Sequence, residues 1–175
     1  MSRAITWARI GLLVIALGCG ACLDSDDALI RRFHDHRATF DHLVAMSDSD
    51  STVVRIAYTF TRLYNNWSWP RDDSLIGLTP ARWHTSRAVF DTLGLKDGLQ
   101  RESTTGDSIP GRDAVLTLWS SSFGMVNRGE YKGYVFSRHP LDHLRPSLDD
   151  RALDGARHGY ALRSIAPNWY LDFEW

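Results

Sequence analysis

The chain has 175 residues, of which 43% are hydrophobic and 23% charged, and its formal net charge is −1. This composition is that of one ordinary globular domain and excludes an intrinsically disordered chain. The near-neutral charge and the lack of a basic block in the sequence argue against a nucleic-acid partner.

The N-terminus has the three zones of an export signal. Arg3 and Arg9 precede an apolar run from Ile10 to Leu17, and Gly18 to Cys22 consists of small residues and cysteine. This order predicts a signal peptide over residues 1–18. The apolar run is shorter than the roughly 20 residues that a helix needs to span a bilayer. Loss of the signal removes two arginines and no acid, which lowers the net charge to −3.

Both cysteines of the chain lie at this junction. Gly18-Cys19 supplies the small residue followed by cysteine that a lipobox requires, so we expect Cys19 to be lipidated and to become the mature N-terminus. Cys22 is the alternative site, and simple cleavage near Ala21, giving a soluble periplasmic protein, is the third interpretation. Two or more acyl chains hold a protein on a membrane stably, whereas one holds it marginally. Residues 19–27 would then form a lipid-anchored tether and residues 28–175 a single domain.

The first half of the predicted domain contains two helices and one strand. Apolar residues at helical spacing, among them Leu29, Phe33 and Phe40, predict a helix over 27–46. Alternation over 54–60 predicts a half-buried strand. Thr79 as N-cap, Pro80 at the first helical position and a following Gly94 predict a helix over 80–93. A short strand is expected near 99–103.

The last third is predicted to be β-structure. Strand patterns occupy residues 114–119, 131–136, 158–165 and 169–175, with a loop over 139–150 and a tight turn at 166–168. In the last strand Trp169, Leu171, Phe173 and Trp175 share one face, and Tyr170, Asp172 and Glu174 share the other. The expected fold class is α+β, with two helices packed on one face of a mainly antiparallel sheet and a C-terminal β-meander.

The order of these segments resembles a family of small, uncharacterised bacterial lipoproteins. The similarity rests on the terminal cysteine of the signal, the helix ALIRRFHDHRATFDHLVAM, the segment FDTLGLKDGL, the K-G-Y strand and the ending SIAPNWYLDFEW. The resemblance implies an address in the cell envelope. It implies no activity, because it brings no catalytic residues with it.

Two sets of residues are candidate sites. His139, Asp142 and His143 could bind a metal ion if their loop is helical, because both histidines would then lie on one face; the alternative is a polar surface loop. Trp67 and Trp69, in a predicted loop with Asn66 and Arg71, are the best candidates for a ligand-binding surface, since exposed aromatic rings bind sugars, peptides or lipid headgroups. The alternative is a loop pinned to the sheet by its tryptophans.

Catalysis is not predicted. The serines of the segment SSSFG lie in a strand and are expected to face solvent, and no local nucleophile signature surrounds them. We assign no catalytic residue and no cofactor. The sequence therefore predicts a cell-envelope lipoprotein that acts as a binding or scaffolding module. Its expected partners are a membrane, through the lipid anchor, and an envelope protein or glycan. A periplasmic immunity or inhibitor protein and a metal-dependent envelope enzyme are the alternatives.

Overall fold

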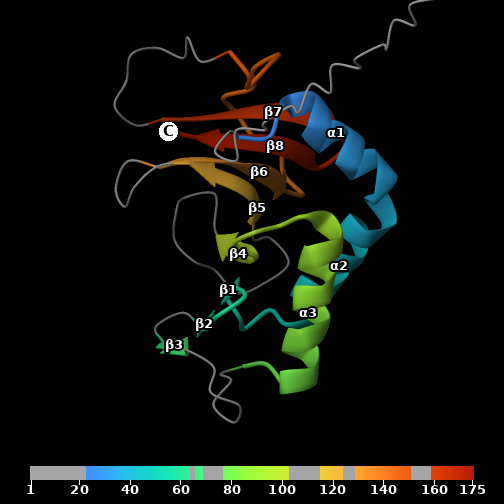
Figure 1. Ribbon diagram of the computed structural model, residues 1–175, viewed down its shortest axis with the longest axis vertical. Helices are drawn as coiled ribbons and strands as arrows, with labels where there is room; N and C mark the ends of the chain where they lie inside the picture. The colour runs from blue at the N-terminus through green and yellow to red at the C-terminus, as the bar shows by residue number, and fades with distance from the viewer. Residues whose placement is uncertain (1–22, 64–65, 69–76, 103–114, 124–128, 151–158) are drawn as a thin grey trace, which may run out of the picture.

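The computed structural model describes residues 23–63, 66–68, 77–102, 115–123, 129–150 and 159–175. Figure 1 shows the arrangement of its elements along the chain. In chain order they are α1 (Asp26–Asp35), α2 (Arg37–Ser49), β1 (Arg55–Ile56), β2 (Thr61–Leu63), β3 (Asn66–Ser68), α3 (Pro80–Leu93), β4 (Leu99–Glu102), β5 (Val115–Phe123), β6 (Glu130–Phe136), β7 (Tyr160–Ala166) and β8 (Trp169–Glu174).

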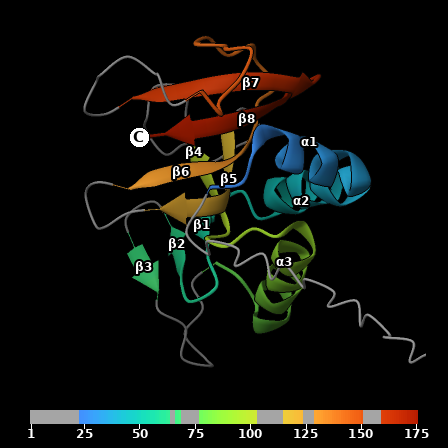
Figure 2. The same cartoon turned by 45° about the horizontal axis from the view of Figure 1, so that its top comes forward.

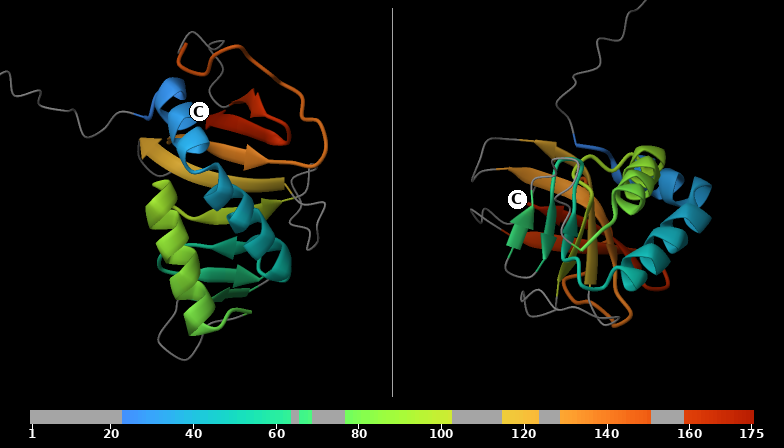
Figure 3. Two further views of the ribbon diagram at one scale, coloured as in Figure 1. Left: turned by 90° about the vertical axis from the view of Figure 1, so that its right-hand side faces the viewer. Right: turned by 90° about the horizontal axis from the view of Figure 1, so that it is seen from below.

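The strands form one sheet with the order β3-β2-β1-β4-β5-β6-β8-β7. Every pairing between these strands is antiparallel. The helices all lie on one face of the sheet, which Figure 2 and Figure 3 show from three further directions. The predicted α+β class, with helices on one face and strands at the C-terminus, is confirmed. The C-terminal strands depart from a simple meander at one point: β8 pairs with β6 and lies between β6 and β7, so β7 forms the edge of the sheet.

Local signals set the ends of α3. Thr79 accepts a hydrogen bond from the backbone N–H of Arg82 at 3.2 Å, Pro80 occupies the first turn, and Gly94 ends the helix with φ of 64°. An Oγ acceptor at the N-cap satisfies a backbone donor that the helix cannot, and glycine adopts the left-handed conformation without steric cost. The predicted span of 80–93 is therefore confirmed.

Two other predicted elements differ from the structure. The helix expected over 27–46 is broken at His36, whose φ of −119° and ψ of 22° separate α1 from α2. The strand expected over 54–60 is a tight hairpin instead, since the N–H of Ala57 donates to the carbonyl of Phe60 at 2.9 Å and β1 pairs with β2. Neither change has a glycine, proline or asparagine at its turning point to announce it.

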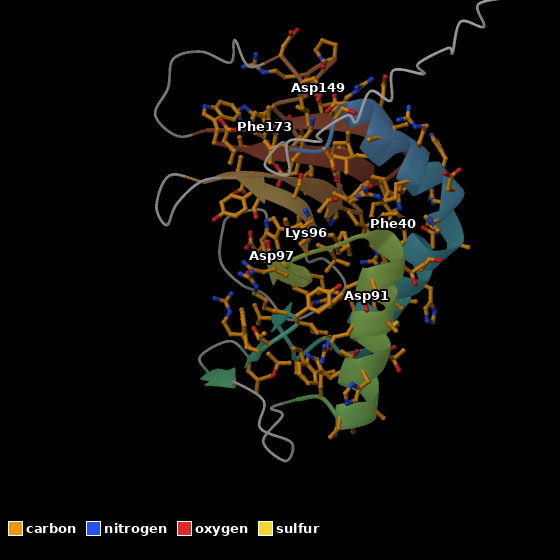
Figure 4. All side chains as sticks on the ribbon, in the orientation of Figure 1. Phe40, Asp91, Lys96, Asp97, Asp149 and Phe173 are labelled. Carbon is orange, nitrogen blue, oxygen red and sulfur yellow. The ribbon has the colours of Figure 1, made fainter. Side chains whose placement is uncertain are left out.

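The core lies between the helices and the sheet. Phe40, labelled in Figure 4, is fully buried, with its ring centroid 4.6 Å from that of Tyr134 and 5.4 Å from that of Trp169. Phe33 also contacts Trp169, at 5.3 Å. Burial of each such ring contributes about 1.5–3 kcal/mol relative to exposure. This aromatic cluster joins α1 and α2 to β6 and β8.

A buried ionic cluster fixes the start of α1 to the sheet. Asp26 is 1% exposed, with Nζ of Lys132 2.6 Å from one carboxylate oxygen and Nη1 of Arg163 2.7 Å from the other. Burial by itself would raise the pKa of Asp26. The backbone N–H of Leu148 and the side chains of Lys132 and Arg163 donate hydrogen bonds to the carboxylate. Together these hydrogen bonds outweigh the effect of burial and hold the pKa of Asp26 below its ordinary value.

The segment just before α1 belongs to the folded domain. Leu23 packs against the core, and the backbone N–H of Asp24 donates to Oγ of Ser121 at 3.2 Å. The backbone N–H of Asp26 donates to the Asp149 carboxylate, labelled in Figure 4. Residues 23–27, predicted to be part of the tether, are therefore held by the sheet.

The serines of β5 also differ from expectation. The strand has an irregularity between Trp119 and Ser121, and both Ser120 and Ser121 are buried on the side of the helices. Oγ of Ser120 accepts from Arg32 at 2.6 Å and donates to Asp24 at 2.9 Å. The expectation that these serines face solvent is wrong for Ser120 and Ser121, because the shift in register turns both inward to satisfy polar groups of α1 and the segment before it.

Candidate functional site

The face of the sheet turned away from the helices, here called the outer face, is built by strand alternation. Trp169, Leu171 and Phe173 of β8 enter the core. Successive side chains of a strand point to opposite faces, so Asp172 and Glu174 lie on the outer face. This division of β8 is the one predicted from its sequence.

A small apolar cluster lies on the outer face. Its buried members are Val135 of β6, Leu162 of β7 and Tyr170 of β8, and Val115 and Leu141 pack against them. These residues come from three neighbouring strands, from the start of β5 and from the segment after β6. The cluster gives the outer face an apolar floor that a flat polar sheet surface would not have.

A cavity of about 400 Å³ opens over this floor. It lies over β4 to β8 and is bounded on one side by residues 140–143. Four of its lining residues are acidic, namely Glu102, Asp142, Asp172 and Glu174, and the others are apolar or uncharged polar groups together with His143. Cavities of roughly 300–1,000 Å³ with apolar walls and a few polar groups are typical of small-molecule sites.

Asp172 is the most unusual of these groups. Its residue is 5% exposed, and it is flanked across the strands by Gly133 of β6 and Leu162 of β7. Burial, together with the charges of Glu174 and Glu102, raises the pKa of Asp172 to about 8, although the backbone N–H of Phe173 partly opposes the shift. Neither Gly133 nor Leu162 has a side chain that can donate a hydrogen bond, so the two cross-strand neighbours of Asp172 provide no side-chain donor.

The other two strand carboxyls of the cavity share this environment. Burial raises the pKa of Glu102, while Arg62 and Arg55 of the adjoining strands oppose the shift. Gln100 donates a hydrogen bond to Glu102. Burial and then the charge of Glu102 raise the pKa of Glu174. Mutual repulsion thus adds to desolvation, and the three groups resist full ionisation at the same time.

The loop after β6 contributes the mouth of the cavity. Asp142 and His143 both line it, and the His143 ring meets the Tyr160 ring edge-on with centroids 4.9 Å apart. The Tyr160 residue is 52% exposed. An exposed aromatic ring beside acidic groups can bind a cation through a cation–π contact.

The predicted metal ligands are only partly brought together. Residues 139–143 are not helical, which removes the condition on which that prediction depended, and His139 is exposed. The backbone N–H of His139 donates to Oγ of Ser137 at 3.2 Å. Within the described residues, no group of three or more histidine, cysteine, aspartate or glutamate side chains is arranged to hold a metal ion. Asp142 and His143 instead share the acidic cavity.

The other predicted site residues lie elsewhere. Asn66 and Trp67, predicted to be in a loop, belong to β3 at the edge of the sheet, where Trp67 pairs with Arg62. Trp69 and Arg71 lie outside the described residues, as do Cys19 and Cys22. In the strand order, β3 lies at the opposite edge of the sheet from β6, β8 and β7, which carry most of the cavity.

The sequence of β8 contains one signal for the cavity. Asp172 and Glu174 sit at alternate positions of a strand whose other residues are apolar or aromatic. Acidic residues have low strand preference, so two of them in a terminal strand indicate a special environment. Glu102 and Val115 gave no such signal, because only the pairing of β4 with β5, of β5 with β6 and of β6 with β8 brings them to the same cavity as Asp172.

Comparison with known proteins gives no match. No family model matches the chain, and no curated protein and no solved structure is significantly similar to it. In the described part of the chain, the helices are too short or too polar to cross a membrane.

Proposed function

We propose that the protein is a lipoprotein of the bacterial cell envelope whose domain binds a small ligand in the acidic cavity of the outer face. The observation that carries the binding role is Asp172, an almost fully buried carboxyl group that lines a cavity of about 400 Å³. Burial of an ionisable group away from a partner costs free energy. A functional role is one reason for a protein to keep such a group, and perturbed carboxyls in a cavity are typical of binding sites.

The envelope address is supported by the N-terminal sequence. The charged start, the apolar run and the Gly18-Cys19 step are, in this order, the features of a lipoprotein signal. The same features give the resemblance to small bacterial lipoproteins. The lipid would hold the domain at a membrane surface, where the cavity meets ligands of the periplasm.

The fold supports Cys19 over Cys22 as the modified residue. Leu23 packs against the core and Asp24 is hydrogen-bonded to β5. A lipid on Cys22 would therefore start directly at the domain surface. A lipid on Cys19 leaves residues 20–22 as a spacer, which spans at most about 10 Å when extended. Three residues between the lipid and the domain would allow the acyl chains to enter a bilayer while α1 stays on the sheet.

The address is tested by mass spectrometry of the mature N-terminus in membrane and soluble fractions. We expect the wild-type chain in the membrane fraction, starting at an acylated Cys19. A Cys19→Ser variant should lose the acyl mass and the membrane location, and the matched Cys22→Ser variant should keep both. An intact, unmodified chain in the cytosol would refute the envelope address. Loss of the acyl mass in Cys22→Ser alone would move the anchor to Cys22.

A further inference from the structure

We propose that the cavity on the outer face binds a small organic ammonium ion, that is, a primary amine on a short hydrocarbon body. The ammonium group would lie against Asp172 and Glu174, and the hydrocarbon against Val135 and Leu162. This inference deepens the proposed function and rests on it, since it names the ligand class of the same cavity.

The lining of the cavity is acidic. Four acidic residues line it, and the described lining includes neither lysine nor arginine. Asp172 forms no ion pair with a described residue that lines the cavity. The backbone N–H of Phe173 is its one hydrogen-bond donor among the groups that shift its pKa, and the charges acting on it are the like charges of Glu174 and Glu102. A cation placed against the carboxylate would offset both the repulsion and the cost of desolvation and would favour the ionised form.

The helix side of the same sheet provides an internal comparison. Asp26 is buried to a similar degree, at 1% exposed against 5% for Asp172. Lys132 and Arg163 lie within 2.7 Å of Asp26 and keep its pKa low. The protein thus supplies a cationic partner to the buried carboxylate that holds the fold together. The charges that act on the similarly buried carboxyl group of Asp172 are the like charges of Glu174 and Glu102, so a ligand can bring the cationic partner that Asp172 lacks.

The walls of the cavity favour an organic cation over a bare metal ion. Val115, Val135, Leu141 and Leu162 contribute apolar surface, which hydrocarbon covers and a hydrated ion does not. Calcium takes six to eight oxygen ligands at about 2.3–2.6 Å. The described residues provide no such cluster. The exposed ring of Tyr160 at the mouth can add a cation–π contact to an ammonium group.

Binding should be linked to proton release. Burial and the neighbouring carboxylates raise the pKa of Asp172 to about 8, so the free protein holds a proton on this group at neutral pH. A bound ammonium ion favours the ionised form and therefore releases that proton. The other titratable groups that line the cavity are Glu174 on β8, Glu102 on β4, Tyr160 on β7, and Asp142 and His143 on the loop. Burial raises the pKa of both Glu102 and Glu174, and protonation of either also weakens the attraction for a cation. Affinity should therefore rise with pH as the carboxyls lose their protons.

Isothermal titration of the full chain, purified with its native N-terminus, tests the inference. The probes are 1,4-diaminobutane and n-butylamine, with 1-butanol as the neutral match and butyrate as the anionic one. We expect saturable binding of the amines at about pH 8, weaker binding at about pH 6, and proton release detected in buffers of different ionisation enthalpy. Asp172→Asn should bind the amines about tenfold more weakly, or about 1.4 kcal/mol. The matched Asp150→Asn variant, at an exposed position, should bind as wild type does.

The outcomes separate the two proposals. Amine binding no stronger than that of 1-butanol, or amine binding unaffected by Asp172→Asn, overturns the inference. Saturable binding of butyrate or 1-butanol overturns it too, but leaves a small-molecule binding role in place. A circular dichroism spectrum of Asp172→Asn that matches wild type shows that loss of binding is not loss of folding. Saturation by calcium with no response to amines assigns the cavity to a metal ion and also overturns the inference.

Discussion

Replacing Asp172 by asparagine should stabilise the protein at neutral and higher pH. Asparagine has the shape of a protonated aspartate and cannot ionise. In the wild-type protein, the pKa of Asp172 is raised from 3.8 to about 8 by burial and by Glu174 and Glu102. The native state therefore keeps a proton that the unfolded chain has already released over this interval. The stability of the wild type is complete below the lower pKa and falls as pH rises towards the upper one.

The size of the effect follows from the interval. Each unit of pKa difference corresponds to about 1.4 kcal/mol. A pH of 7 lies roughly 3 units above the pKa of Asp172 in the unfolded chain, so the wild type has lost at most about 4 kcal/mol of free energy of unfolding at this pH. Relaxation around a 5% exposed group lowers that figure. We expect Asp172→Asn to gain about 2–4 kcal/mol in free energy of unfolding at pH 7 and to gain nothing near pH 4.

Urea denaturation at a series of pH values measures both quantities. The wild-type free energy of unfolding should fall more steeply with pH than that of Asp172→Asn, by up to about 1.4 kcal/mol per pH unit between pH 5 and 7. Asp150→Asn, at an exposed position, should keep the wild-type slope. Equal slopes in the wild type and Asp172→Asn would refute the argument, because they would show that Asp172 ionises as freely in the native state as in the unfolded chain.

Three further substitutions test the fold by the same denaturation assay. Phe40→Ala should cost about 3–5 kcal/mol because it empties a site fully enclosed by the aromatic cluster; a loss below about 1 kcal/mol would contradict that packing. Lys132→Ala should cost about 3–5 kcal/mol because it leaves Asp26 and Asp149 without a shared cation, whereas Lys96→Ala, at an exposed position, should stay near wild type. Thr79→Ala should cost about 1 kcal/mol through loss of the N-cap of α3, and restoration by Thr79→Ser would assign that loss to the hydroxyl group.

The sequence by itself determined the elements whose signals are local. Thr79, Pro80 and Gly94 mark both ends of α3 because capping involves only backbone groups within a turn of the helix. Alternation along 169–175 assigned each residue of β8 to its face, since the period of a strand does not depend on its neighbours. Together these patterns were sufficient for the α+β class with helices on one side of the sheet.

The tertiary structure decided what depends on partners distant in the chain. The break at His36 has no local helix breaker, and it accompanies the packing of both Phe33 and Phe40 on Trp169 of β8. The position of β8 between β6 and β7 likewise depends on pairing across the sheet. Local sequence patterns extend over a few residues and carry no information on such pairings.

The candidate site belongs to the second group. The sequence placed Asp172 on the correct face, but the pKa of Asp172 depends in part on Glu102, which is 70 positions away in the chain. The pairing of β4 with β5, of β5 with β6 and of β6 with β8 brings the two carboxyls to one cavity. Desolvation and repulsion act through space and not along the chain. The sequence therefore determined which groups could ionise, and only the folded sheet decided which of them are buried together.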